Sequence, residues 1–252
     1  MKQTGGKRCY YCGGLVTSGE HIPPKQMFKP FECDSITVPS CDEHNTKKSG
    51  RDQAIVSAFL LPLYTGRNQY DLESEIIQAI DAALPSFERV KHNAIRTSFI
   101  KDPPLALADL PDLAYLVPEV DTSAWIRQLT AGIVYNGIGS SSQTIAWSKA
   151  KAWSPNRFPS DSPVPSKHAD EVLQISQAYD ERRLELDKLT WQEGWSATPR
   201  PYPKIIYSFQ VHLGDKKEII FRHKFYNRYT WYVKFRISGS NLARLLEKLS
   251  NT

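Results

Sequence analysis

Apolar and polar residues alternate along three stretches near the C-terminal end of the chain. These stretches are Lys204 to Leu213, Glu218 to Phe225 and Tyr229 to Ile237, and only short turns separate them. Strict alternation is typical of strands that bury one face, and short turns join neighbouring antiparallel strands. We therefore expect a three-stranded antiparallel meander, followed by a terminal helix from Asn241 to Leu249.

The middle of the chain, residues 56–152, has helical rather than alternating periodicity. Between Asp71 and Leu84, apolar residues recur at the spacing of one buried helical stripe, and Pro85 ends the pattern. A further helix is expected from Ser123 to about Tyr135. Its inward-facing residues are expected to be Trp125, Ile126, Leu129 and Ile133. No chemical motif stands out in this part, so we interpret it as a helical scaffold.

The clearest boundary is Trp153 to Lys167, where four prolines and four serines fall within fifteen residues. Such a composition is typical of a stiff connector with little packing. The sequence thus predicts an α+β protein in four parts. They are a small N-terminal unit at 1–55, the helical scaffold at 56–152, the linker at 153–167, and a basic α+β region at 168–252 that contains the meander.

Composition adds limits on location and partners. None of the 252 residues belongs to an apolar run long enough for a membrane helix, which needs roughly 18 residues, and the first residues lack the apolar core of a signal peptide. We therefore expect a cytoplasmic protein without a membrane partner. The formal net charge is +5. The segment from Arg200 to Ile237 contains nine basic and two acidic residues, and nine minus two gives it a net charge of +7. This basic region favours an anionic partner.

The N-terminal unit carries the candidate chemistry. Its core-poor sequence contains a Cys-x-x-Cys pair, Cys9 and Cys12, and a Cys-x-x-His pair, Cys41 and His44. Two such pairs can close one tetrahedral zinc site, and a cytoplasmic setting favours a metal over disulfides. Cys33 is an alternative fourth ligand. A structural zinc would supply the folding energy that so small a unit lacks.

Secondary structure in this unit follows from the same stretch. Gly13-Gly14 suits a turn with positive φ, Ser35 to Val38 resembles a short strand, and a helix is expected from about Asp42 to Leu61. Between the two metal pairs lies the dipeptide Glu20-His21, and Asn45 directly follows the second pair.

The ordered set C-x-x-C-G, E-H-I-P-P-K, V-P-S-C-x-x-H-N, K-S and D resembles the zinc-knuckle type of the HNH endonuclease family, over roughly residues 9–55. The resemblance implies a ββα-metal unit in which His21 activates water, while Glu20 and Asn45 hold catalytic Mg²⁺ or Mn²⁺. Asp52 is a further candidate for the metal, and a solvated helix carboxylate is the alternative. The family's middle asparagine has no counterpart near Asp34 or Ser35, so no residue is assigned to orient His21.

Basic residues supply candidate nucleic-acid contacts. Lys25 and Lys48 lie within the motif, and an ordinary solvated lysine is the alternative for Lys48. One face of the predicted meander carries Arg222, Lys224, Lys234 and Arg236. Such a face can follow a phosphate backbone, and a solvated sheet face is an equally ordinary explanation.

Three functions follow as hypotheses. The first is a metal-dependent endonuclease that hydrolyses phosphodiester bonds in DNA, with RNA not excluded. The second is a zinc-stabilised nucleic-acid-binding module without catalysis. The third is a nuclease subunit that is active only within a larger assembly, such as a phage-defence complex. The sequence leaves a protein partner or a homo-oligomer open.

Overall fold

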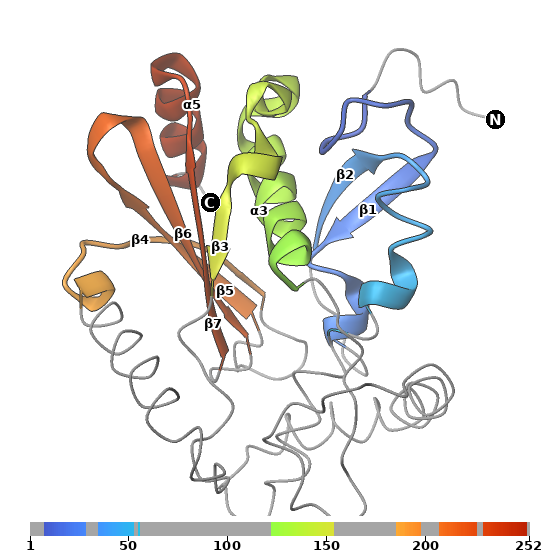
Figure 1. The fold of residues 1–252 in the computed structure, drawn as a ribbon, viewed down its shortest axis with the longest axis horizontal. Helices are drawn as coiled ribbons and strands as arrows, with labels where there is room; N and C mark the ends of the chain where they lie inside the picture. The colour runs from blue at the N-terminus through green and yellow to red at the C-terminus, as the bar shows by residue number, and fades with distance from the viewer. Residues whose placement is uncertain are drawn as a thin grey trace, which may run out of the picture.

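A single helix, α3, stands between a small N-terminal hairpin and a C-terminal sheet (Figure 1). The computed structural model describes residues 8–28, 35–52, 55, 122–153, 185–197, 207–225 and 229–250. These residues confirm a mixed α+β protein. The helix predicted between Asp71 and Leu84, the linker after Trp153 and the residue Cys33 lie outside the described residues.

The C-terminal sheet is larger than the alternation predicted. The meander is confirmed as β5 (Tyr207–Leu213), β6 (Glu218–Phe225) and β7 (Tyr229–Arg236), with a short 3-10 turn, η6 (Asp215–Lys217), between the first two. The prediction of three strands was wrong, because β3 (Lys151–Trp153) pairs with β7 and β4 (Gln192–Ala197) pairs with β5. The result is a five-stranded antiparallel sheet in the order β3-β7-β6-β5-β4. Segment 56–152, expected to be helical, therefore gives its last residues to this sheet.

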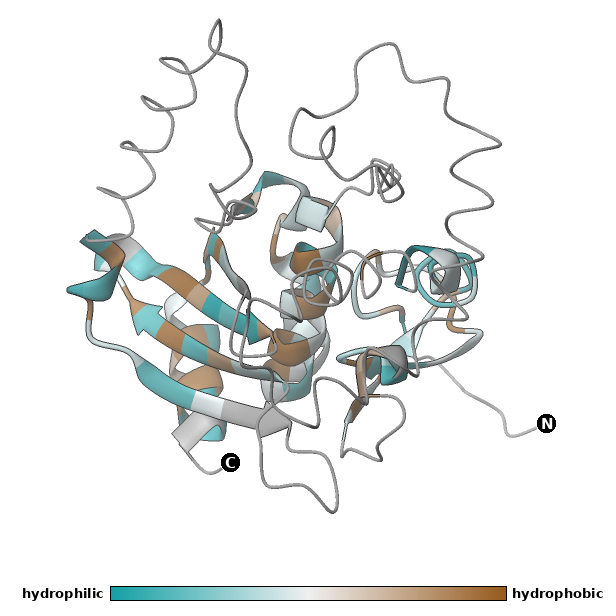
Figure 2. Cartoon of the chain, turned by 90° about the horizontal axis from the view of Figure 1, so that it is seen from below, coloured by the Kyte–Doolittle hydropathy of each residue, from teal (hydrophilic) through white to brown (hydrophobic). Residues whose placement is uncertain are grey.

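The alternation of apolar and polar residues separates the two faces of the sheet. Residues Phe209, Phe221 and Phe235 lie on one face and are buried, while intervening residues on β6 are only partly buried. Colour alternates along the strands in Figure 2, where α3 and α5 (Gly239–Ser250) lie behind them. Both helices thus cover the apolar face, which explains the period of two in the sequence.

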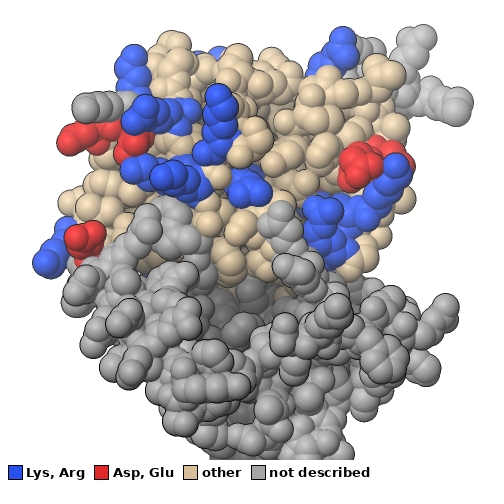
Figure 3. Space-filling view, viewed as in Figure 1, with Lys and Arg blue, Asp and Glu red and all other residues tan. Residues whose placement is uncertain are grey.

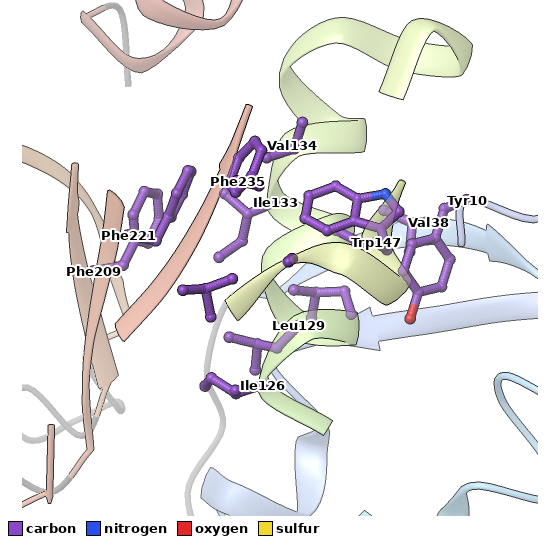
Figure 4. Packing of buried hydrophobic residues seen from close by; sticks show 14 of the residues in the cluster. Tyr10, Val38, Ile126, Leu129, Ile133, Val134, Trp147, Phe209, Phe221 and Phe235 are labelled. Carbon is purple, nitrogen blue, oxygen red and sulfur yellow. The ribbon is translucent and has the colours of Figure 1, made fainter. Parts of the chain in front are cut away.

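Helix α3 (Thr122–Ile138) connects the two halves of the molecule. The four residues predicted to point inward, Trp125, Ile126, Leu129 and Ile133, are all buried. Figure 4 shows Ile133 and Val134 of α3 beside Phe235 of the sheet, with Tyr10 and Val38 of the N-terminal unit across the helix. One continuous hydrophobic cluster includes residues from all of these elements, so α3 shares its core with both the sheet and the hairpin.

The N-terminal unit consists of a hairpin and the start of a helix. Strands β1 (Ser18–Ile22) and β2 (Ile36–Ser40) pair in antiparallel register, with Glu20 opposite Val38. The second strand begins one residue later and ends two residues later than the predicted Ser35 to Val38. The helix expected from Asp42 begins at Ser49, because hydrogen-bonded turns occupy residues 42–48. A short 3-10 helix, η1 (Lys25–Phe28), follows Pro24.

Two further 3-10 helices, η3 (Gly139–Thr144) and η4 (Trp147–Lys149), lead from α3 into β3. The ring centroids of Trp147 and Phe235 are 4.9 Å apart, so η4 packs against the sheet. Among the described helices, none is long and apolar enough to cross a membrane.

Candidate metal centre and hairpin site

Three cysteine sulfurs and one histidine nitrogen come together beside the hairpin. The ligand atoms of Cys9, Cys12, Cys41 and His44 all lie within 4.8 Å of one another. The Cys12 and Cys41 sulfurs are 3.7 Å apart, and His44 Nδ1 lies 3.2 Å from Cys41 Sγ and 3.9 Å from Cys9 Sγ. Tetrahedral zinc with three sulfurs and one nitrogen has S–S edges of about 3.8 Å and S–N edges of about 3.6 Å. The predicted grouping is confirmed, and it can hold a structural zinc.

Tight turns present these ligands. The Gly13 N–H donates to the Cys9 carbonyl at 3.0 Å, and the Gly14 N–H points at the Cys12 sulfur at 3.4 Å. Gly13 has φ of +73°, the left-handed conformation that glycine adopts without steric cost, as its sequence position predicted. In the second turn the His44 N–H donates to the Cys41 carbonyl at 3.1 Å. Local backbone bonds therefore determine where each pair of ligands points.

The electrostatics of the cluster favour a cation. Burial raises the pKa of the Cys9 thiol, but hydrogen bonds from His44 and from nearby backbone N–H groups outweigh it and lower the pKa to about 5. Burial, together with the neighbouring Cys9, raises the pKa of Cys12 to about 11. The thiols thus cannot all ionise freely beside one another. A zinc ion removes this conflict because it binds thiolates.

Glu20 lies on the buried face of the hairpin and pairs with Lys48. The two side chains are 3% and 2% exposed, and the Lys48 Nζ contacts Glu20 Oε1 directly. Ser40 Oγ donates to Glu20 Oε2 at 3.4 Å, and Lys48 Nζ also lies 3.6 Å from Asp52 Oδ1. Asp52 accepts a hydrogen bond of 2.8 Å from Trp125 Nε1 of α3. These residues form a buried charged cluster: Glu20, Lys48 and Asp52, with Ser40 and Trp125 as hydrogen-bond donors.

Burial governs the protonation of both acids in this cluster. The pKa of Glu20 is raised by burial, against the opposing effect of Lys48. The pKa of Asp52 is raised for the same reason, against Lys48 and the hydrogen bond from Trp125. One ammonium between two buried carboxylates thus does not restore the stability that their charges have in water.

His21 and Asn45 lie near Glu20 but do not join this cluster. Because side chains alternate along a strand, His21 points to the face of β1 opposite Glu20. Burial and the charge of Lys25 lower the pKa of His21, which favours the neutral imidazole. Asn45 Nδ2 donates to Ser18 Oγ at 2.7 Å and to the Gly19 carbonyl at 3.1 Å. Asn45 therefore ties the turn after β2 back to β1.

No described side chain hydrogen-bonds the His21 imidazole, so the orienting group for this histidine is not found among the residues that the structure describes. Of the two predicted ligands of a catalytic metal, Glu20 is already paired with a lysine, while the Asn45 amide keeps its oxygen. Lys48 holds the Glu20 carboxylate, and the Asn45 amide is hydrogen-bonded through its nitrogen to β1. We therefore assign no reaction step to a catalytic metal.

The basic residues of the sheet share one face, but most have acidic partners. Glu218 pairs with both Lys234, at 2.7 Å, and Arg236, at 3.2 Å. The guanidinium of Arg222 lies 4.3 Å from the ring centre of Trp191. It also lies 3.5 Å from Asp187. On the molecular face shown in Figure 3, lysine and arginine side chains gather over the sheet and over the hairpin unit. The pairing reduces the positive charge available on the sheet.

Several contributing residues could not be found from the sequence. Trp125 lies 73 positions from Asp52, and Gln143 of η3 donates to the Cys9 carbonyl from 134 positions away, at 3.0 Å. Ser18 and Ser40 carry no signal that distinguishes them from other serines in strands. Only the spacing of Asp52 four residues after Lys48 indicated that those two side chains could meet on one helical face.

Comparison of the chain with protein-family models, with curated proteins and with solved structures found no match.

Proposed function

We propose that this chain is an endonuclease of the HNH type that hydrolyses phosphodiester bonds in DNA. The observation that carries the proposal is the place of Glu20-His21 on β1, within a hairpin whose base holds the Cys₃His cluster. Asn45, the third motif residue, is bonded back to that strand. The order of the motif in the sequence and its place on the hairpin therefore support the same assignment.

His21 is the base in this proposal. A water molecule attacks phosphorus, its proton passes to the imidazole, and the bond from phosphorus to the leaving oxygen breaks. The leaving oxygen then takes a proton from solvent. Burial and Lys25 both lower the pKa of His21, so the imidazole is neutral and able to accept a proton at neutral pH. Lys25 is exposed close to His21 along the chain and can contact the substrate phosphates.

Cleavage of supercoiled plasmid tests the proposal. We expect the zinc-loaded protein to nick or cut the plasmid in the presence of Mg²⁺ or Mn²⁺, and His21→Ala to lose about 10²–10⁴-fold of the rate. The rate should rise with pH through a value below 6.5, because the base form of His21 is required and its pKa is lowered.

His212→Ala is the matched control, because it removes a histidine on the sheet rather than on the hairpin. Equal cleavage by His21→Ala and the parent protein would refute the assignment of His21. Parallel reactions with single-stranded DNA and with RNA define the substrate.

The buried pair of Glu20 and Lys48 favours a second candidate, a nucleic-acid-binding module without catalysis. Here the motif residues stabilise the hairpin, and binding comes from basic side chains near it. This candidate predicts salt-sensitive DNA binding that persists in His21→Ala, with no cleavage in any divalent metal.

A further inference from the structure

Three basic side chains gather where the edge strand β3 pairs with β7. Lys151 of β3 lies directly opposite Lys234 of β7, so both side chains are on the same face of the sheet. Arg236 follows two positions after Lys234 on β7 and shares that face. This face points away from α3 and α5, because Val233 and Phe235, which alternate with the basic residues, are buried in the core. We call Lys151, Lys234 and Arg236 the basic edge.

The basic edge carries more positive charge than its surroundings neutralise. Glu218 pairs with Lys234 at 2.7 Å and with Arg236 at 3.2 Å. The hydrogen bond from Lys234, and the contacts with Arg236, lower the pKa of Glu218, which is therefore ionised at neutral pH. Lys151 has no acidic partner among the residues that the structure describes. Three cations minus one carboxylate leave a net charge of +2.

This excess charge is accessible from solvent. Lys151 is exposed, and the side chains of Lys234 and Arg236 are 37% and 70% exposed. Lysine and arginine side chains can be seen over the sheet in Figure 3. Like charges directly opposite each other on neighbouring strands destabilise a sheet, so an anion bound between Lys151 and Lys234 would relieve their repulsion. The surface therefore fits an anionic partner.

Arg222, on the same face, does not belong to this surface. Its Nε donates to Gln210 Oε1 at 2.6 Å, and its guanidinium lies 3.5 Å from Asp187 and 4.3 Å from the ring centre of Trp191. Its side chain is only 12% exposed. The guanidinium is thus already bound within the protein, and the open cations of this face are those of the basic edge.

The aromatic residues that the structure describes on this face are poorly placed to stack on bases. Tyr232 is 2% exposed, and Trp191 is partly buried with Arg222 against its ring. Proteins that bind single-stranded nucleic acid combine cations with aromatic rings on which successive bases stack. Cations without such rings contact the phosphates, which lie on the outside of a duplex. The described part of this face therefore fits a double strand better than a single strand.

We propose that the basic edge binds the phosphate backbone of double-stranded DNA. Lys234 and Arg236 are about 7 Å apart along β7, and Lys151 lies about 5 Å across from Lys234, so the cations extend over more than one phosphate. The inference rests on the proposed function in taking DNA as the polyanion. The surface itself uses no residue of the hairpin.

The test measures the binding of zinc-loaded full-length protein to a short labelled duplex by fluorescence anisotropy, over a series of salt concentrations and without added Mg²⁺ or Mn²⁺. The informative variant is Lys151→Gln, which removes one phosphate contact. The slope of log K against log salt should become less negative by about 0.9, and affinity at about 0.1 M salt should fall about eightfold. Lys151→Arg keeps the charge and should keep the parental slope. The duplex should bind more tightly than either of its strands alone.

The matched control is Arg244→Gln, which removes one exposed cation from α5, on the other side of the sheet. It should leave the slope unchanged. Both glutamine variants should melt at the parental temperature, because neither side chain is buried. Equal slopes for the parent and Lys151→Gln, or the same loss of slope in Arg244→Gln, would overturn the proposal. Tighter binding of single strands than of the duplex would also overturn it, as would binding to phosphatidylserine vesicles without binding to the duplex.

These outcomes are distinct from those of the cleavage assay. Duplex binding that depends on Lys151, with no cleavage in any divalent metal, refutes the nuclease and leaves the binding surface intact. Cleavage that depends on His21, with an unchanged salt slope in Lys151→Gln, has the opposite meaning.

Discussion

His223 gives the sharpest quantitative prediction, because its surroundings fix its protonation state. The imidazole is fully buried in the sheet core, where Nε2 lies 2.9 Å from Thr130 Oγ1 and Nδ1 lies 2.8 Å from the Tyr207 hydroxyl. Thr130 donates its only hydroxyl proton to the Ile126 carbonyl, at 2.8 Å. Thr130 must then accept from Nε2–H, so Nδ1 accepts from Tyr207. The neutral Nε2–H tautomer satisfies every one of these bonds.

Low pH should therefore destabilise the packing of the sheet against α3, which the hydrogen bond between His223 and Thr130 supports. Burial lowers the pKa of His223 from 6.5 to about 3, so the unfolded chain binds this proton more readily than the folded protein does. The stabilisation is complete above the unfolded value and is lost as the pH falls from 6.5 towards 3. The full shift corresponds to about 5 kcal/mol, of which about 2 kcal/mol is lost between pH 7 and pH 5.

Urea unfolding of the parent protein and His223→Gln at pH 7 and pH 5 measures this contribution. Glu20 and Asp52, whose pKa values burial raises, change stability in the opposite direction, so the difference between the two proteins is the relevant quantity. We expect the free energy of unfolding to fall by about 2 kcal/mol more in the parent than in His223→Gln. An equal fall in both proteins would show that His223 is not buried as a neutral imidazole.

Two other predictions concern the N-terminal unit. Removing zinc with a chelator, or replacing Cys41 by Ser, should abolish amide-exchange protection in β1 and β2, while β5 to β7 should stay protected. The reason is that the metal supplies most of the folding energy of so small a unit. Unchanged protection of β1 and β2 in the zinc-free protein would contradict this. Replacing Gly132 by Ala should destabilise the protein by about 1–3 kcal/mol, since the added carbon would lie 2.5 Å from Ile22 Cγ1. The control is Gly50→Ala, where the added carbon meets nothing within 4 Å. A Gly132→Ala protein as stable as the control would refute the close packing of α3 on β1.

Local signals in the sequence were sufficient for some elements and for the metal ligands. The meander and α3 follow from periodicity, since a strand or helix that buries one face repeats its apolar residues at a fixed spacing. The Cys₃His cluster follows from two ligand pairs at metal spacing. Strands β3 and β4 were not predicted, because both are edge strands of the sheet and their sequences show no clear alternation of apolar and polar residues. Their pairing depends on the strands beside them.

The sequence by itself therefore determined the candidate zinc ligands, the central strands and the inward face of α3, because each depends on residues close together in the chain. Only the tertiary structure decided the surroundings of Glu20. Lys48 contacts it from the turn after β2 and also lies 3.6 Å from Asp52, and Trp125 of α3 donates to Asp52. Spacing along the chain cannot specify which cation neutralises a buried carboxylate, since that depends on which side chains the fold brings within a few ångströms.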